Sequence, residues 1–190
     1  MHPTPGLQIE LVDRSEFDLF LAYLNDHLSD NGQGDTAYFH PVPRNEPHMQ
    51  PDKAEAFRNG LQVRVGCPGW RRIWVARTPQ RQIVGHVDLR SHPMRFAAHR
   101  CLLGMGVERT HRRSGIGEQL IAHAQQWAQA SDLLEWIDLQ VLSVNEPALR
   151  LYRRAGFEVT GETPEMFRID GQTYSYVSMA KRVAPPHVAR

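Results

Sequence analysis

Residues 102–117 read LLGMGVERTHRRSGIG, and this stretch decides the fold. The apolar run Leu102–Val107 predicts a central strand, and the basic segment Glu108–Ser114 predicts a turn. The glycine-flanked start of an amphipathic segment follows at once. The order strand, turn, helix therefore predicts that the chain passes from the middle of a sheet directly into a helix.

The turn has the composition of a phosphate site. A helix N-terminus presents unpaired N–H groups and a partial positive charge, which suit an anion. Gly115 and Gly117 lack a Cβ, so the backbone can approach a diphosphate closely. Arg112 and Arg113 add charge-assisted donors. We interpret the loop as a seat for the diphosphate of a nucleotide-like cofactor; the alternative is a basic surface turn.

Composition bounds the class of protein. The chain has 190 residues, 41% hydrophobic and 23% charged, which predicts one globular domain over residues 1–183 and a tail at 184–190. The formal net charge of +1 gives no global signal for nucleic acid. No apolar run is long enough to cross a membrane, and no signal peptide is evident. Two distant cysteines, Cys67 and Cys101, are typical of the cytoplasm.

Periodicity predicts the other elements. We expect strands near 7–12, 73–76, 83–89, 101–107, 136–142, 157–160 and 173–180. Helices are expected from Asp13 in a capping box to about Ser29, from Asp52, after Gly117, and from an Asn145 cap to Gly156. This order predicts an α/β fold with a mixed sheet and helices on its faces.

Two motifs resemble those of the GNAT superfamily of acyl-CoA-dependent N-acetyltransferases. The first is Arg/Gln-x-x-Gly-x-Gly/Ala between a strand and a helix, present as residues 112–117. The second is an Asn followed by a short helix with Leu-Tyr and a final Gly-Phe, present as residues 145–157. The resemblance covers about residues 73–180. It implies a mostly antiparallel sheet of six or seven strands with about four helices, and a cofactor cleft between two splayed central strands.

One position departs from the family pattern. Many members have Gly directly after the first Arg of the motif, where this chain has Arg113. A Pro that is frequent three residues before that first Arg is replaced by Arg109. Arg113 either adds a phosphate contact or points to solvent.

The resemblance implies that acetyl-CoA is the acyl donor. The ten histidines form no tight His-x-x-x-His or Cys/His set, so we expect no metal site. The pantetheine arm of acetyl-CoA would pair with backbone groups near Val107 and Arg109, and its diphosphate would meet the motif. The residues that the resemblance assigns to the cofactor are Val107, Arg109, Arg112, Arg113, Ser114, Gly115, Ile116, Gly117 and Asn145. Asn145 can equally serve as a helix N-cap, and the two roles are compatible.

Acetyl transfer needs a neutral amine, a donor to the thioester oxygen and an acid for the leaving thiolate. Tyr152 matches the family's tyrosine acid, although core packing is the ordinary role of such a tyrosine. Two side chains are candidates for the general base: His86, which shares a strand face with Asp88, and Glu108. Members of the family often use water instead.

The acceptor site has the weakest signal. In this family the first helices and their connection border it, and here that region contains Tyr38, Phe39 and His40, which with Asp88 are candidate substrate contacts. The segment from Asp18 to Glu55 contains seven acidic residues but only two lysine or arginine residues. The acidic residues form either an acidic rim that favours a cationic amine or a solvated helix face.

The predicted function is transfer of acetyl from acetyl-CoA to a primary amine of a small molecule, of amino acid, polyamine or amino-sugar type. The alternatives are a CoA-binding sensor with little turnover and an N-acetyltransferase of proteins or peptides. We expect no nucleic-acid or membrane partner and a cytoplasmic location, and a homodimer agrees with the habit of many relatives. The sequence leaves open the acceptor, the base, the oligomeric state and the preference for a longer acyl-CoA.

Overall fold

The computed structural model describes residues 6–184. The elements, in order, are β1 (Gln8–Leu11), α1 (Phe17–Leu28), α2 (Pro51–Gly60), β2 (Arg71–Arg77), β3 (Ile83–Ser91), β4 (Arg100–Val107), a 3₁₀ turn η1 (Arg109–His111), α3 (Ile116–Gln129), β5 (Trp136–Leu142), α4 (Glu146–Arg154), β6 (Glu158–Ile169) and β7 (Gln172–Arg182). The predicted tail at 184–190 lies, except for its first residue, outside the described residues.

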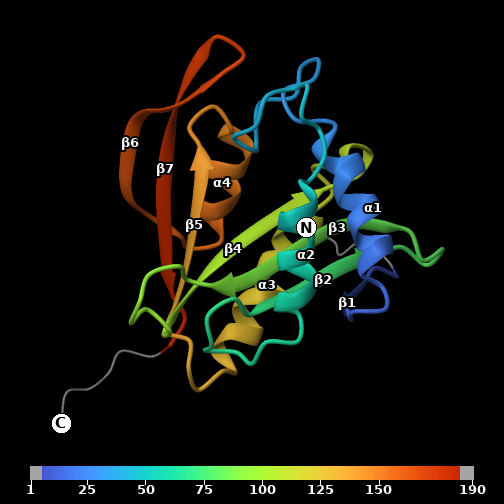
Figure 1. The fold of residues 1–190 in the computed structure, drawn as a ribbon, viewed down its shortest axis with the longest axis vertical. Coiled ribbons are helices and arrows are strands. Elements are labelled where there is room, and N and C mark those ends of the chain that lie inside the picture. The colour runs from blue at the N-terminus through green and yellow to red at the C-terminus, as the bar shows by residue number, and fades with distance from the viewer. Residues whose placement is uncertain (1–5, 185–190) are drawn as a thin grey trace.

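The seven strands form one sheet in the order β1-β2-β3-β4-β5-β7-β6, as Figure 1 shows. The pair β4–β5 is parallel, and every other neighbouring pair is antiparallel. The predicted fold class, a mostly antiparallel sheet of six or seven strands with four helices, is therefore confirmed.

Helices cover both faces of the sheet. A Cβ on Gly85 would meet Leu120 and Ile116 of α3, whereas a Cβ on Gly106 would meet His27 of α1. Gly85 and Gly106 belong to adjacent residue rows of the β3–β4 ladder, so their side-chain directions are opposite. α3 and α1 therefore pack on opposite faces.

Each face has its own core. A large cluster on the α3 side includes Val87, Leu120 and Ile137, and a smaller one packs Phe17 and Phe20 of α1 against the sheet. Phe17 and Phe20 are both almost fully buried. Burying a large apolar side chain contributes roughly 1.5–3 kcal/mol, which is enough to fix α1 on this face.

The helix starts differ in detail from the predictions. Asp13 Oδ1 accepts the N–H groups of Ser15 at 2.7 Å and Glu16 at 3.1 Å, but α1 begins only at Phe17. The reciprocal half of the predicted capping box does not form, because the Glu16 carboxylate binds Arg77 at 2.9 Å.

The predicted Asp52 cap of α2 is also wrong. The helix starts at Pro51 with Gln50 as its N-cap, which is two residues before Asp52. Pro suits the first turn, where its missing N–H is not needed.

Candidate active site

The central strands part in the middle of the sheet. β4 pairs with β5 at Arg100↔Trp136, Cys101↔Ile137 and Leu102↔Asp138, where the pairing ends. β4 nevertheless continues to Val107 along β3, and β5 continues to Leu142 along β7. The backbone of β4 after Leu102 thus has a ladder partner on one side and a widening gap on the other.

The predicted phosphate loop lies at the end of this gap. Gly115 has φ +83° and serves as the N-cap of α3, a conformation that favours glycine. Ser114 Oγ donates to the carbonyl of His111 at 2.5 Å. Ile116 and Gly117 follow in the first turn of α3, so their backbone N–H groups belong to the orphan donors of a helix start.

Gly117 also has a packing role that the sequence did not indicate. A Cβ there would lie 3.0 Å from Leu151 Cδ2 of α4 and 3.3 Å from Met105 Cε of β4. The absence of a side chain at Gly117 therefore lets α3 approach α4 and β4 closely.

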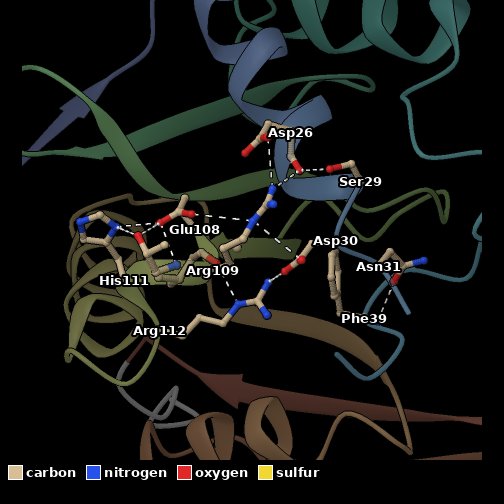
Figure 2. A network of polar contacts seen from close by, with 12 residues as sticks. Asp26, Ser29, Asp30, Asn31, Phe39, Glu108, Arg109, His111 and Arg112 are labelled. Atoms are coloured by element: carbon tan, nitrogen blue, oxygen red, sulfur yellow. Dashed lines mark hydrogen bonds and ion pairs between the residues drawn. The ribbon is translucent and has the colours of Figure 1, made fainter. Parts of the chain in front are cut away.

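Arg109 and Arg112 are held by acids in the last turn of α1 and directly after it, as Figure 2 shows. Arg109 Nη2 lies 3.1 Å from Asp26 Oδ1, and Arg112 Nη2 forms an ion pair with Asp30. Arg112 Nε also donates to the carbonyl of Val107 at 3.3 Å. Both guanidinium groups therefore have protein partners in this structure and would have to exchange them to reach a phosphate.

Arg113, where many family members have glycine, adopts a backbone conformation that favours glycine. It is exposed and has φ +62°, in the left-handed region where glycine is favoured. The turn thus requires a conformation that glycine adopts freely and arginine adopts at a cost.

Glu108 stabilises the turn. Its carboxylate accepts the Thr110 N–H at 2.9 Å and lies 2.8 Å from His111 Nδ1 (Figure 2). Burial raises the pKa of Glu108, but these hydrogen bonds outweigh burial and leave the pKa below its ordinary value. The carboxylate is therefore ionised and already committed to the loop.

Tyr152 lies buried on α4. Its ring packs edge-to-face on Phe157, with centroids 5.9 Å apart. Burial raises the pKa of the phenol, and the charges of Tyr176 and Asp88 raise it further. The phenol therefore keeps its proton at neutral pH, as a proton donor must.

Asn145 caps α4, since its Oδ1 accepts the Ala148 N–H at 3.3 Å. The predicted N-cap is confirmed, while its predicted contact with the cofactor arm stays a prediction. Gly156, with φ +86°, follows the helix end as expected.

His86 belongs to a cluster of aromatic rings that the sequence did not reveal. Its Nδ1 lies 3.2 Å from the Tyr23 hydroxyl, and its ring packs edge-to-face on Phe20 and His27. Burial lowers the pKa of His86 to about 4. The imidazole is therefore neutral at pH 7 and able to accept a proton.

His27 seats this cluster on β4. Its ring stacks between Tyr23 and Phe39, with centroids at 6.3 and 4.7 Å. A Cβ on Gly106 would fall 2.4 Å from His27 Nε2, so the glycine makes room for the ring. Burial lowers the pKa of His27 to about 3, and its buried Nδ1 has no hydrogen-bond partner among the described residues. The helical spacing of α1 predicted a buried face but not a polar ring on it.

The loop between α1 and α2 crosses the gap. Asn31 anchors it, because its side chain binds the backbone of Phe39, His40 and Val42 at 2.9–3.0 Å. Tyr38 then donates to Asp170 in the β6–β7 turn. The loop therefore joins the two halves of the sheet over the α1 face.

The predicted substrate residues lie in different settings. Phe39 stacks on His27, whereas Tyr38 packs at 5.2 Å from Tyr174. His40 lines a hollow below the loop, where burial lowers its pKa to about 4. Asp88 is buried and ion-paired with Arg71 and Arg90.

Much of the predicted acidic rim is neutralised by arginine. Asp26 and Asp30 pair with the arginines of the turn, and Asp18 and Glu55 both pair with Arg58. A simple acidic rim is therefore a poor description of this surface.

Within residues 6–184, no group of three or more His, Cys, Asp or Glu side chains is arranged to hold a metal ion. In the same range no helix has the length and apolar character needed to cross a membrane.

Comparisons with known proteins point to one family. Residues 69–159 match the family model of the acetyltransferase (GNAT) domain. Mouse (Mus musculus) N-acetyltransferase family 8 member 3 is 32% identical over 117 residues, which are 60% of this chain and 49% of that protein. The chain thus spans about half the length of the curated relatives it matches.

Solved structures share the fold at low identity. A GNAT acetyltransferase from Streptococcus pneumoniae has a TM-score of 0.75 and 22% identity, covering 93% of this chain and 99% of its own. The spermidine N-acetyltransferase from Vibrio cholerae, in complex with CoA and spermine, has a TM-score of 0.69 and 19% identity over 94% and 96%. Residues 69–159 thus match the GNAT acetyltransferase domain, and the chain as a whole shares the fold of solved GNAT acetyltransferases.

Proposed function

We propose that the protein is an acetyl-CoA-dependent N-acetyltransferase that acts on a primary amine of a small molecule. The observation that carries this proposal is the end of the β4–β5 pairing at Leu102 and Asp138, directly before the turn that leads into α3.

The residues present fit the cofactor. Backbone groups of β4 from Leu103 to Val107 face the gap, and an extended arm can pair with such an edge as an added strand. At its end, the first N–H groups of α3 and the glycine conformation at Gly115 suit a diphosphate. Arg112 and Arg113 lie in the same turn and can contribute charge.

The chemistry then divides among few side chains. Bound acetyl-CoA would supply an acetyl group activated as a thioester. Tyr152, whose phenol stays protonated, donates a proton to the leaving sulfur. His86 is neutral and is the stronger candidate to accept the proton of the amine, directly or through water. Glu108 is the weaker one, because Thr110 and His111 already occupy its carboxylate.

A small acceptor agrees with the covered site. The loop around Tyr38 and Phe39 is fastened at Asn31 and Asp170, which encloses the α1 side of the gap. The relative from Vibrio cholerae is named for spermidine, a small amine. A CoA-binding module with little turnover, and a peptide acceptor, are the alternatives.

Two measurements test the function. Acetyl-CoA should raise the melting temperature, whereas ATP and NAD at equal concentration should not. A panel of small amines should then show release of CoA that depends on the amine. Stabilisation without release for any amine or peptide would favour the sensor, and release with peptides alone would favour the peptide acceptor. No stabilisation by acetyl-CoA would overturn the proposal.

A further inference from the structure

Three charged side chains meet on the sheet face that carries α1 and α2. Arg71 of β2 and Arg90 of β3 are paired across the ladder, and Asp88 lies two residues before Arg90 on the same face. Both arginines donate to the same oxygen, Asp88 Oδ1, with Arg90 Nη1 at 3.2 Å. The side chains of Arg71 and Asp88 are buried, while that of Arg90 is 32% exposed.

This cluster is pressed against the gap. Asp88 Oδ2 occupies the space that a Cβ on Gly104 of β4 would need, at 2.3 Å. The carboxylate is therefore locked against the strand that we propose to bind the donor. Asp88 and Arg90 also act electrostatically on the Tyr152 phenol, since Asp88 raises its pKa and Arg90 lowers it. The cluster therefore lies within electrostatic range of the proposed acid.

Positive charge exceeds negative charge around the cluster. Lys53 of α2 joins it: burial lowers the Lys53 pKa, Arg90 and Arg71 lower it further, and Asp88 raises it. Glu46 lines the same small hollow as Lys53, but the surrounding charges that act on Lys53 are those of Arg90, Arg71 and Asp88. One carboxylate, that of Asp88, therefore pairs with two arginines, and Lys53 adds a third positive charge nearby.

Arg90 has donors to spare. A guanidinium carries five N–H donors, and Arg90 uses Nη1 in its contact with Asp88. Arg71 is fixed differently, because its guanidinium also stacks on Phe57 at 3.3 Å from the ring centroid. Of the two arginines, Arg90 is the more exposed and the better placed to meet a ligand.

We propose that Arg90, supported by Lys53, binds a carboxylate of the acceptor, so that the preferred amines are amino acids or similar compounds. This inference rests on the proposed function and names the acceptor class. A planar guanidinium matches a carboxylate with two parallel hydrogen bonds. A polyamine would instead bring positive charge toward three like charges, and the acids on α1 that could offset it are paired with arginine.

The test is a panel of matched pairs. Each amino acid is compared with the amine that remains when its α-carboxylate is removed, such as phenylalanine with phenethylamine and lysine with cadaverine. The measured quantity is kcat/KM for CoA release at saturating acetyl-CoA. We expect the amino acid of an accepted pair to be preferred at least about tenfold, since a polar site rejects a ligand that leaves it unpaired.

Arg90→Gln locates the effect. It should reduce that preference at least about tenfold, mainly through KM of the amino acid, and leave the decarboxylated amine within about twofold. Arg58→Gln is the matched control, because Arg58 pairs with Asp18 and Glu55 outside the cluster, and it should keep the preference. Lys53→Gln should act in the same direction as Arg90→Gln with a smaller effect.

The outcomes separate the two proposals. Equal use or preference of the decarboxylated amines, or an Arg90→Gln loss that is the same for both members of a pair, would overturn the acceptor assignment and leave the acetyltransferase standing. Acetyl-CoA binding without turnover of any amine would overturn the proposed function and the acceptor assignment with it.

Discussion

The two sides of the parted strands are built in opposite ways. The side that we assign to the donor consists of consecutive residues, from β4 through the turn into α3, and it offers mostly backbone groups. The side that we assign to the acceptor gathers side chains from α1, the following loop, α2, β2 and β3. A site made of backbone tolerates changes of side chain, whereas a site made of packed polar side chains selects its ligand and costs stability when disturbed.

The pH dependence of stability should expose this difference most strongly. Burial lowers the pKa of His27 to about 3 and those of His40 and His86 to about 4, all on the acceptor side. The unfolded chain takes up these protons near pH 6.5, while the folded chain does not. Stability should therefore fall as pH drops from 6.5 toward 4, by up to about 1.4 kcal/mol per pH unit for each ring.

Urea unfolding at several pH values measures this slope. His27→Phe should reduce it by about one proton, or about 1.4 kcal/mol per pH unit. His99→Gln, at an exposed position, is the control and should keep the slope. An unchanged slope in His27→Phe would mean that the ring is protonated in the folded protein and that the acceptor side is more polar than its packing indicates.

The proposed acid lies where the two sides meet. Tyr152→Phe removes the proton donor but keeps the ring on Phe157, so single-turnover acetyl transfer should slow by about 100-fold or more. The shift of melting temperature by acetyl-CoA should not change. Tyr176→Phe removes the hydroxyl of a half-buried tyrosine on β7, and its single-turnover rate should stay within about threefold of that of the parent protein. If Tyr176→Phe slowed acetyl transfer and Tyr152→Phe did not, the general acid would be Tyr176 of β7.

Alanine substitutions at two strand glycines compare a crowded position on the acceptor side with an open position on β6. In Gly106→Ala the new methyl must displace the His27 ring, which is held between Tyr23 and Phe39, so we expect a loss of about 1–3 kcal/mol. A Cβ on Gly161 of β6 would have no atom of residues 6–184 within 4 Å, and Gly161→Ala should be neutral or slightly stabilising. Chemical denaturation measures both. Equal effects would show that the ring moves freely and that the acceptor side is not tightly packed.

The same contrast explains what the sequence could predict. β5 was predicted with its observed bounds, Trp136–Leu142, and the Asn145 cap was predicted as found, because both depend on neighbours in the chain. β6 was predicted to end at Thr160 but runs to Ile169, since its residues are mostly exposed and two register shifts break their alternation. No local pattern marked the part of the strand after Thr160.

The acceptor side depends on contacts that periodicity cannot show. His27 lies on α1 at the spacing of an ordinary core residue, and its contact with Gly106 joins residues far apart in the chain. Asp26 and Asp30 likewise pair with Arg109 and Arg112, which lie far away in the chain. The count of charges along the sequence could not show these pairs and suggested an acidic rim instead. Long-range pairing therefore decides charge and polarity here, whereas a short motif decides the turn.

Arg113 gives the smallest predicted effect and the sharpest test of the donor side. Its φ of +62° favours glycine over arginine, so Arg113→Gly should stabilise the protein by up to about 1 kcal/mol in urea unfolding. Arg113→Asn also removes the charge, and because asparagine tolerates this conformation the variant should be stabilised by less than Arg113→Gly. If the site binds through backbone alone, both variants keep the KM of acetyl-CoA. A several-fold rise of the KM of acetyl-CoA in both variants would show that Arg113 contacts phosphate. The charge at this position would then offset the conformational cost of the turn.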